Sequence, residues 1–282
     1  MTSASGNSAE AAAYEAGIQV WRQEMDERLR SDTGWLTLTG LYWLHEGENT
    51  LGSDPACDVF LPESAPQRVG VLEFHDQAVT LHVTTDVEVR VDNEPTQSAV
   101  LRDDHDPLGP SPVQIGSVSF NVIKRADQYG IRVRDRDNPA RLAFTGRRWF
   151  SVDPAYQVTA AFVPHPQARE LVITNSVGID IAMSNPGYVE FRLEDQDVRL
   201  AAFSAGEGEL WFVFRDASER TYRAGRFLYG SLRDDGTAIL DFNKAYNPPC
   251  AFTPYATCPL PPKENILPLK IEAGEQAPEH PV

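Results

Sequence analysis

The sequence is poor in the residues and motifs that usually mark catalytic or metal-binding proteins. Its three cysteines, Cys57, Cys250 and Cys258, lack the spacing of a metal site. Its six histidines show neither the i, i+4 spacing of a helical zinc site nor the alternate spacing that places two imidazoles on one face of a strand. A phosphate-binding glycine loop and a G-x-S-x-G nucleophile elbow are also missing. We therefore expect no metal and no cofactor.

Long apolar runs and positive charge are scarce too. No stretch approaches the roughly 20 apolar residues of a membrane span. Lysine and arginine total 25 against 41 acidic residues, giving a formal net charge of -16. Such a surface repels phosphate backbones and anionic lipids, so neither nucleic acid nor a membrane is an expected partner. The N-terminus lacks the basic and apolar regions of a secretory signal, which predicts a cytoplasmic protein with a disordered tail at residues 1–13.

The hydrophobic pattern predicts one helix followed by a mainly β protein. In residues 14–30 the apolar side chains recur at helical spacing: Ile18, Trp21, Met25 and Leu29. From residue 35 onward, short runs rich in aromatic and β-branched residues alternate with Gly, Pro, Asp and Asn, as in β-sandwiches and barrels. We expect the helix and a β-sandwich over residues 14–125. A second antiparallel β-sandwich or barrel is expected over residues 126–282.

The first β region resembles a forkhead-associated (FHA-like) β-sandwich. The resemblance rests on three successive stretches: ENTLGSDPACDVFLPES, VGVLEFHDQAVTLHVTTDVEVRVDNEPT and QIGSVSFNVI. The FHA family binds phosphothreonine through an arginine just after the first glycine and a Ser-x-x-His step. Here Ser53 follows Gly52, Arg68 is displaced and no Ser-x-x-His step follows. The resemblance thus implies the fold but not the reading of phosphothreonine.

The second β region resembles the DUF1684 family, a set of bacterial and archaeal proteins of unassigned function. Three stretches carry this resemblance: RDRDNPARLAFTGRRWFSVDPAYQV, TYRAGRFLYGSL and LDFNKAYNPPCAFTPYATCPLPPKENILPLKIEAGE. The family supplies no reaction, so the chemistry has to come from the residues.

A proline-rich stretch at residues 242–265 is the candidate site. Proline removes backbone donors and stiffens the chain, so this stretch predicts a rigid, polar pocket wall beside Arg226, which suits a carboxylate, phosphate or sugar hydroxyl. The predicted ligand-binding residues are Arg147, Tyr222, Arg226, Tyr229, Asn243, Asn247, Cys250, Tyr255 and Asn265. Asp241 and Glu264, with Tyr246, are the candidates for acid–base chemistry. The alternative is that the stretch caps a barrel and that its polar side chains are structural.

The cysteines and the function both leave alternatives open. Cys250 and Cys258 fit buried thiols, a disulfide or a nucleophile. The favoured function is the binding of a small polar or anionic molecule by the second β region, and a hydrolase is one form of it. The alternative is a protein-interaction module that binds a protein partner through the FHA-like half. The residues do not decide whether the protein is an enzyme.

Overall fold

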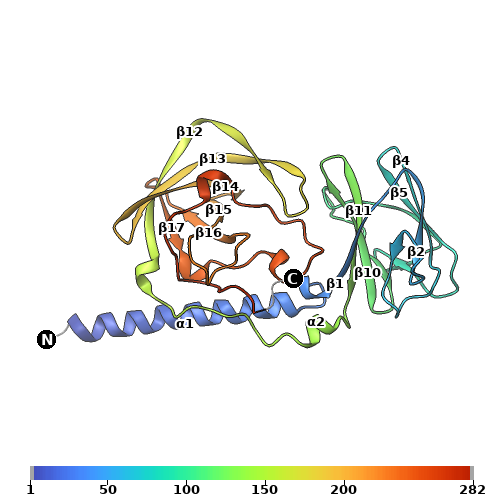
Figure 1. The fold of residues 1–282 in the computed structure, drawn as a ribbon, viewed down its shortest axis with the longest axis horizontal. Coiled ribbons are helices and arrows are strands. Elements are labelled where there is room, and N and C mark those ends of the chain that lie inside the picture. The colour runs from blue at the N-terminus through green and yellow to red at the C-terminus, as the bar shows by residue number, and fades with distance from the viewer. Residues whose placement is uncertain (1–2, 280–282) are drawn as a thin grey trace. The chain divides into compact units, whose positions relative to one another are not determined.

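The computed structural model describes residues 3–279, apart from the side chains of residues 3–8 and 168. The chain forms two compact units (Figure 1). We call Leu29–Phe144 the sandwich unit, and Met1–Arg28 together with Thr145–Val282 the barrel unit. The mainly β fold class with one long N-terminal helix is confirmed. None of the helices within residues 3–279 is long and apolar enough to cross a membrane.

The helix α1 extends over Ser3–Arg30 and therefore starts earlier than the sequence predicts. Residues 3–13, expected as part of a disordered tail, are helical; residues 1–2 lie outside the described chain. The segment AEAAAYEA explains the difference, because alanine and glutamate have high helix propensity. Of the predicted apolar stripe, Ile18 and Leu29 are buried, whereas Trp21 and Met25 are half-buried. The part of α1 up to Arg28 runs along the barrel (Figure 1).

The sandwich unit is built from a six-stranded and a five-stranded sheet. In sheet order, the first contains β1 (Leu38–Trp43), β11 (Gln128–Asp135), β10 (Val118–Arg125), β9 (Val113–Ile115), β6 (Arg90–Val91) and β7 (Glu94–Pro95). The second contains β3 (Val59–Phe60), β2 (Gly47–Gly52), β4 (Gly70–His75), β5 (Ala78–Val83) and β8 (Ser98–Leu101). A 3-10 turn at Trp35–Thr37 and the short helix α2 at Pro139–Leu142 complete the unit.

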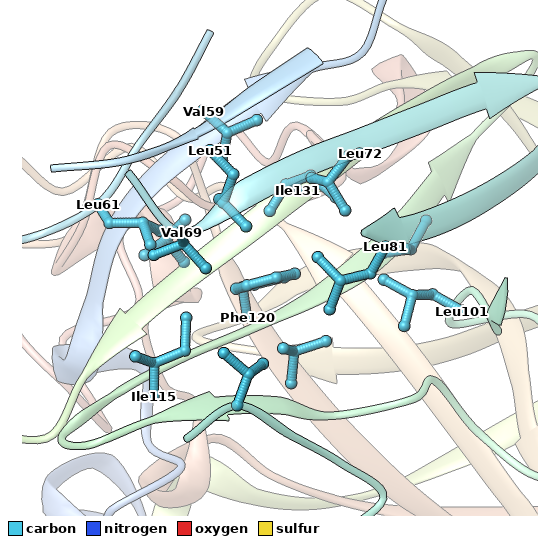
Figure 2. Packing of buried hydrophobic residues seen from close by; sticks show 14 of the residues in the cluster. Leu51, Val59, Leu61, Val69, Leu72, Leu81, Leu101, Ile115, Phe120 and Ile131 are labelled. Atoms are coloured by element: carbon cyan, nitrogen blue, oxygen red, sulfur yellow. The ribbon is translucent and has the colours of Figure 1, made fainter. Parts of the chain in front are cut away.

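The core of the sandwich unit explains where this unit ends. Alternate apolar side chains of its strands, including Leu72, Phe120 and Ile131, form one buried cluster (Figure 2). β11 pairs with both β1 and β10, and its Ile131 and Val133 are fully buried. The predicted division after residue 125 would separate this strand from both of its neighbours. The unit therefore continues to Phe144.

The barrel unit contains a closed barrel of six antiparallel strands. They are β12 (Gln157–Thr174), β13 (Asp180–Leu193), β14 (Gln196–Gly206), β15 (Glu209–Phe214), β16 (Arg226–Leu232) and β17 (Thr237–Asp241). Pairing of β17 with β12 closes the barrel. Short 3-10 turns lie at Pro154–Tyr156, Phe242–Lys244, Pro249–Ala251 and Lys263–Asn265.

The last part of the chain packs into the barrel core. Leu267, Leu269, Ile271 and Ala273 alternate along the segment after the proline-rich stretch, and all four are buried. They join a cluster that includes Phe212 and Leu240 of the strands. This cluster forms the apolar core of the barrel unit.

Candidate functional site

The barrel unit carries a concave pocket of about 670 Å³ beside strands β12, β13 and β14. This volume is in the range typical of small-molecule sites. The lining residues are Val163, Pro164, His165, Pro166, Arg169, Glu170, Leu171, Asn185, Gly187, Tyr188, Arg199, Ala201 and Glu264. Of the residues predicted from the sequence, Glu264 alone lines this pocket.

An irregularity in the sheet creates the pocket. β12 and β13 pair up to Pro164 opposite Gly187, and they pair again from Arg169 opposite Asn185. Residues 165–168 of β12 thus face the single residue Pro186 of β13. Proline lacks the N–H that a regular ladder needs, so the prolines of this region favour such a bulge. Gly187 permits the close approach of the strands, because a Cβ atom there would lie 2.3 Å from the carbonyl oxygen of Val163.

A histidine–asparagine pair forms the polar centre of the pocket. Nε2 of His165 lies 2.7 Å from Oδ1 of Asn185. Nδ2 of Asn185 donates to the carbonyl oxygens of Gly187 and Ala202, at 2.8 and 2.6 Å, so Oδ1 is the acceptor end of this amide. His165 must therefore donate from Nε2, and in the neutral imidazole Nδ1 keeps an acceptor lone pair. The buried Asn185 therefore fixes both the orientation of the His165 ring and the tautomer of its neutral form.

Two arginines contribute positive charge to the pocket. The guanidinium of Arg199 lies 3.5 Å from the ring centroid of Tyr188, and its Nη2 is 3.3 Å from Oε1 of Glu190. Arg199 is therefore engaged in the pocket wall. Arg169 lies at the end of the bulge and has no ion-pair partner within the described residues. Its charge is available to an anionic group in the pocket.

Arg226, the predicted centre of the ligand site, instead lies in the interior of the protein. It is 1% exposed. Its Nη2 lies 2.9 Å from Oδ2 of Asp216 and donates to the carbonyl oxygen of Ile271, and its Nη1 donates to the carbonyl oxygens of Ala273 and Glu275. Burial lowers the pKa of this guanidinium, which the adjacent Asp216 opposes. The geometry favours a structural role, in which Arg226 fixes the C-terminal segment to β16.

Arg147 and Asn247 are joined by a buried acid that sequence reasoning missed. Nη1 of Arg147 lies 2.8 Å from Oε2 of Glu275, and the backbone N–H of Asn247 donates to the same oxygen at 2.8 Å. Arg147 also pairs with Asp26 of α1 at 3.4 Å. Burial raises the pKa of Glu275, while Arg147 acts in the opposite direction. This cluster connects the proline-rich stretch, the C-terminal segment and α1.

Asp241 and Asn243 both form hydrogen bonds with Tyr14 of the helix α1. The hydroxyl of Tyr14 donates to Oδ1 of Asp241 at 2.9 Å and accepts from Nδ2 of Asn243 at 3.0 Å. Asn243 also donates to the carbonyl oxygen of Asp153 and accepts from its N–H. Burial, followed by the neighbouring Asp241, raises the pKa of Tyr14 well above its usual value. Tyr14 was expected near the start of the helix, and the sequence offered no signal for its partners.

The tyrosines and Asn265 attach the proline-rich stretch to the outside of the barrel. Tyr246 stacks on Tyr229 with ring centroids 6.5 Å apart, and burial raises the pKa of Tyr246 above its ordinary range. Asn265 is fully buried and bonds to the backbone of Ala201 and Val213 through three hydrogen bonds of 2.7 to 3.0 Å. Residues 242–265 therefore lie over the strands, and we call them the proline-rich cover. This arrangement agrees with the alternative stated above, in which the stretch caps the barrel and its polar side chains are structural.

The remaining predicted residues lie within the proline-rich stretch or contact it. Tyr255 is half-buried, and its N–H donates to Oγ1 of Thr253. The hydroxyl of Tyr222 donates to the carbonyl oxygen of Cys250 at 3.0 Å. All three cysteines of the chain are thiols. No group of three or more His, Cys, Asp or Glu side chains within the described residues is arranged to hold a metal ion.

Comparison with known proteins agrees with the resemblance of the C-terminal sequence. Residues 142–276 match the family described as "Protein of unknown function (DUF1684)". The match to this family covers most of the barrel unit. The DUF1684 match includes the pocket, the cover and the buried Arg226. None of the curated proteins compared with the chain matches it.

Solved structures similar to this chain include an uncharacterized protein of Haloarcula marismortui, with 30% sequence identity and a TM-score of 0.42. That match covers 50% of this chain and 81% of the other. The FhaA FHA domain, solved in complex with the intracellular domain of Rv3910, is 20% identical with a TM-score of 0.24, and the match covers 33% of this chain and 97% of the domain.

Proposed function

We propose that the barrel unit binds a small polar molecule bearing an anionic group in the pocket at the β12–β13 bulge. The observation that carries the proposal is the combination, in one pocket of about 670 Å³, of an oriented imidazole and an arginine without an internal ion pair. Arg169 supplies the charge for a carboxylate or phosphate, and Nδ1 of His165 accepts a hydrogen bond from a neighbouring hydroxyl or amine of the ligand.

The acidic residues of the pocket restrict the class of ligand that we propose. Glu170 and Glu264 line the same space as Arg169. They favour a molecule that carries hydroxyl or amino groups beside its anionic group, and they disfavour polyanions. A neutral imidazole held by an asparagine can also accept a proton from water, the chemistry that the hydrolytic form of this function would need. The location that we propose for this activity is the cytoplasm.

The proposal moves the site away from the residues first predicted. Asp241, Tyr246 and Arg226 are engaged in holding α1, the cover and the C-terminal segment. Glu264 remains a candidate because it lines the pocket. The ligand class, a small polar or anionic molecule bound by the second β region, is unchanged.

The test is a thermal-shift titration of the full chain with inorganic phosphate, succinate, serine and glycerol 3-phosphate. A ligand that binds the folded state raises Tm. At least one of these compounds should raise Tm of the wild type, and Arg169→Ala and His165→Gln should reduce that rise. Arg192→Ala is the matched control, because Arg192 is an exposed arginine of β13 that pairs with Asp195 and does not line the pocket.

The result that would overturn the proposal is equally specific. If none of the four compounds raises Tm, or if Arg169→Ala responds like the wild type and like Arg192→Ala, no anion is bound at this pocket. A loss of binding in all three variants would also count against it, since Arg192 lies outside the site.

A further inference from the structure

Two cysteines meet in the middle of the proline-rich cover. The backbone N–H of Cys250 donates to Sγ of Cys258 at 3.3 Å. The neighbouring Cys258 side chain is the largest influence that lowers the pKa of the Cys250 thiol. The intervening loop thus folds back and places the two sulfur atoms next to each other, although both are thiols.

The two cysteines differ in solvent exposure and in the hydrogen bonds that hold their backbone. Cys250 is half-buried, whereas Cys258 is 5% exposed. Cys258 is held on the turn after β12, because its N–H donates to Oγ of Ser176 at 3.0 Å and its carbonyl oxygen accepts from the N–H of Ser176 at 2.7 Å. A reagent therefore reaches Cys250 first, while Cys258 stays in place behind it.

Tyr222 lies against the accessible thiol. Its hydroxyl lies 3.8 Å from Sγ of Cys250 and also donates to the carbonyl oxygen of that residue. Burial and the neighbouring cysteines raise the pKa of Tyr222, so it remains a hydrogen-bond donor at neutral pH. The hydrogen bond with Cys258 lowers the pKa of Cys250, and Tyr222 contributes in the same direction against the effect of burial. A thiolate stabilised by two donors is the form of cysteine that attacks disulfides.

We propose that Cys250 and Cys258 form a reactive dithiol that exchanges with small-molecule disulfides. The Cys250 thiolate attacks one sulfur of the small disulfide, the bond between its sulfurs breaks, and one small thiolate leaves. Cys258 then gives its proton to solvent and attacks Sγ of Cys250, expelling the second small thiolate. The two protein thiols are oxidised to one disulfide, and the small disulfide is reduced to two thiols.

Cys57 is an internal control for this chemistry. It is 8% exposed in the sandwich unit, and its Sγ donates to the carbonyl oxygen of Gln67 at 3.8 Å. It is buried and belongs to the sandwich unit, so it serves as the reference thiol for the pair. The folded protein should therefore keep Cys57 as a thiol under conditions that oxidise the pair.

The experiment treats the folded, reduced full chain with oxidised glutathione and follows intact mass and peptide maps over time. The wild type should lose two hydrogen atoms, form the Cys250–Cys258 disulfide and retain no glutathione. Cys258→Ser should keep one glutathione on Cys250, because the second attack is missing. Cys250→Ser should stay unmodified while folded. Tyr222→Phe should slow the first step several-fold at neutral pH, by more than it does at alkaline pH.

Three outcomes would overturn the proposal. One is a folded wild type that stays reduced while the urea-unfolded chain reacts at all three cysteines. Another is a stable glutathione adduct on the wild type, which would mean that Cys258 does not reach Cys250. The third is modification of Cys57 at the same rate as Cys250, which would mean that the pair has no special reactivity. Circular dichroism of each variant checks that it is folded before the reaction.

Discussion

The replacement of Arg226 by methionine tests whether this residue is structural. Its guanidinium and the Asp216 carboxylate are each 1% exposed in their side chains, with 2.9 Å between Nη2 and Oδ2. Arg226→Met would remove the guanidinium donor from Oδ2 of Asp216 and from three backbone carbonyl groups. Removing one partner of a buried ion pair costs about 3–5 kcal/mol, because the other charge stays buried. The free energy of unfolding of the barrel unit should fall by this amount.

The assay is urea denaturation followed by tryptophan fluorescence and circular dichroism. Arg226→Met combined with Asp216→Asn should recover part of the loss, because an asparagine keeps an acceptor for the N–H groups of Ser218 and Ile271 but carries no charge. Arg223→Met is the control, since Arg223 is exposed, and it should change stability by less than about 0.5 kcal/mol. The reasoning is refuted if Arg226→Met costs less than about 1 kcal/mol, or if the double variant is no more stable than the single one.

Three further predictions test the contacts around the barrel. Tyr14→Phe should lower the free energy of unfolding by about 1–3 kcal/mol in urea titrations, because it removes the donor to Asp241; an unchanged stability would mean that α1 is not held there. Asn265→Ala should cost about 2–4 kcal/mol and increase proteolysis of the proline-rich cover, because three buried hydrogen bonds are lost, whereas resistance equal to the wild type would contradict the cover. Since burial raises the pKa of Glu275 above its unfolded value, its contribution is fully present below the ordinary pKa of glutamate and is lost as pH rises through the folded pKa. In urea titrations across acidic pH, Glu275→Gln should flatten this dependence, and an unchanged profile would show that Glu275 is not its source.

The local pattern was enough to predict the helix and the β class. Ile18 and Leu29 of the predicted stripe are buried, and the short alternating runs became strands. α1 starts earlier than the apolar periodicity indicates, because the alanine-rich segment has a high helix propensity but no apolar stripe. The unit boundary was missed because β11 joins the sandwich unit through pairings with β1 and β10 that no local pattern reveals.

The candidate site depended on contacts between distant residues. Tyr14 meets Asp241 across 227 positions, and Arg147 meets Glu275 across 128, so the sequence could not assign these partners. The sequence around Arg226 does not distinguish an arginine that faces solvent from one that pairs with a buried acid such as Asp216. One signal for the pocket was present, however: prolines at 164, 166 and 186 within otherwise strand-like runs indicate an interrupted ladder. That signal could have singled out His165.

The most direct test of the proposed pocket is a histidine side-chain NMR titration of the full chain. Long-range ¹H–¹⁵N spectra of the unliganded chain, recorded at a pH at which imidazole is neutral, should show the His165 proton on Nε2. Adding the compound that raises Tm should shift the His165 Nδ1 signal and the Nε signal of Arg169, with those of His75 and Arg192 unchanged. A His165 that is protonated at Nδ1 alone, or a ligand response that leaves the His165 and Arg169 signals unchanged, would contradict the proposed site.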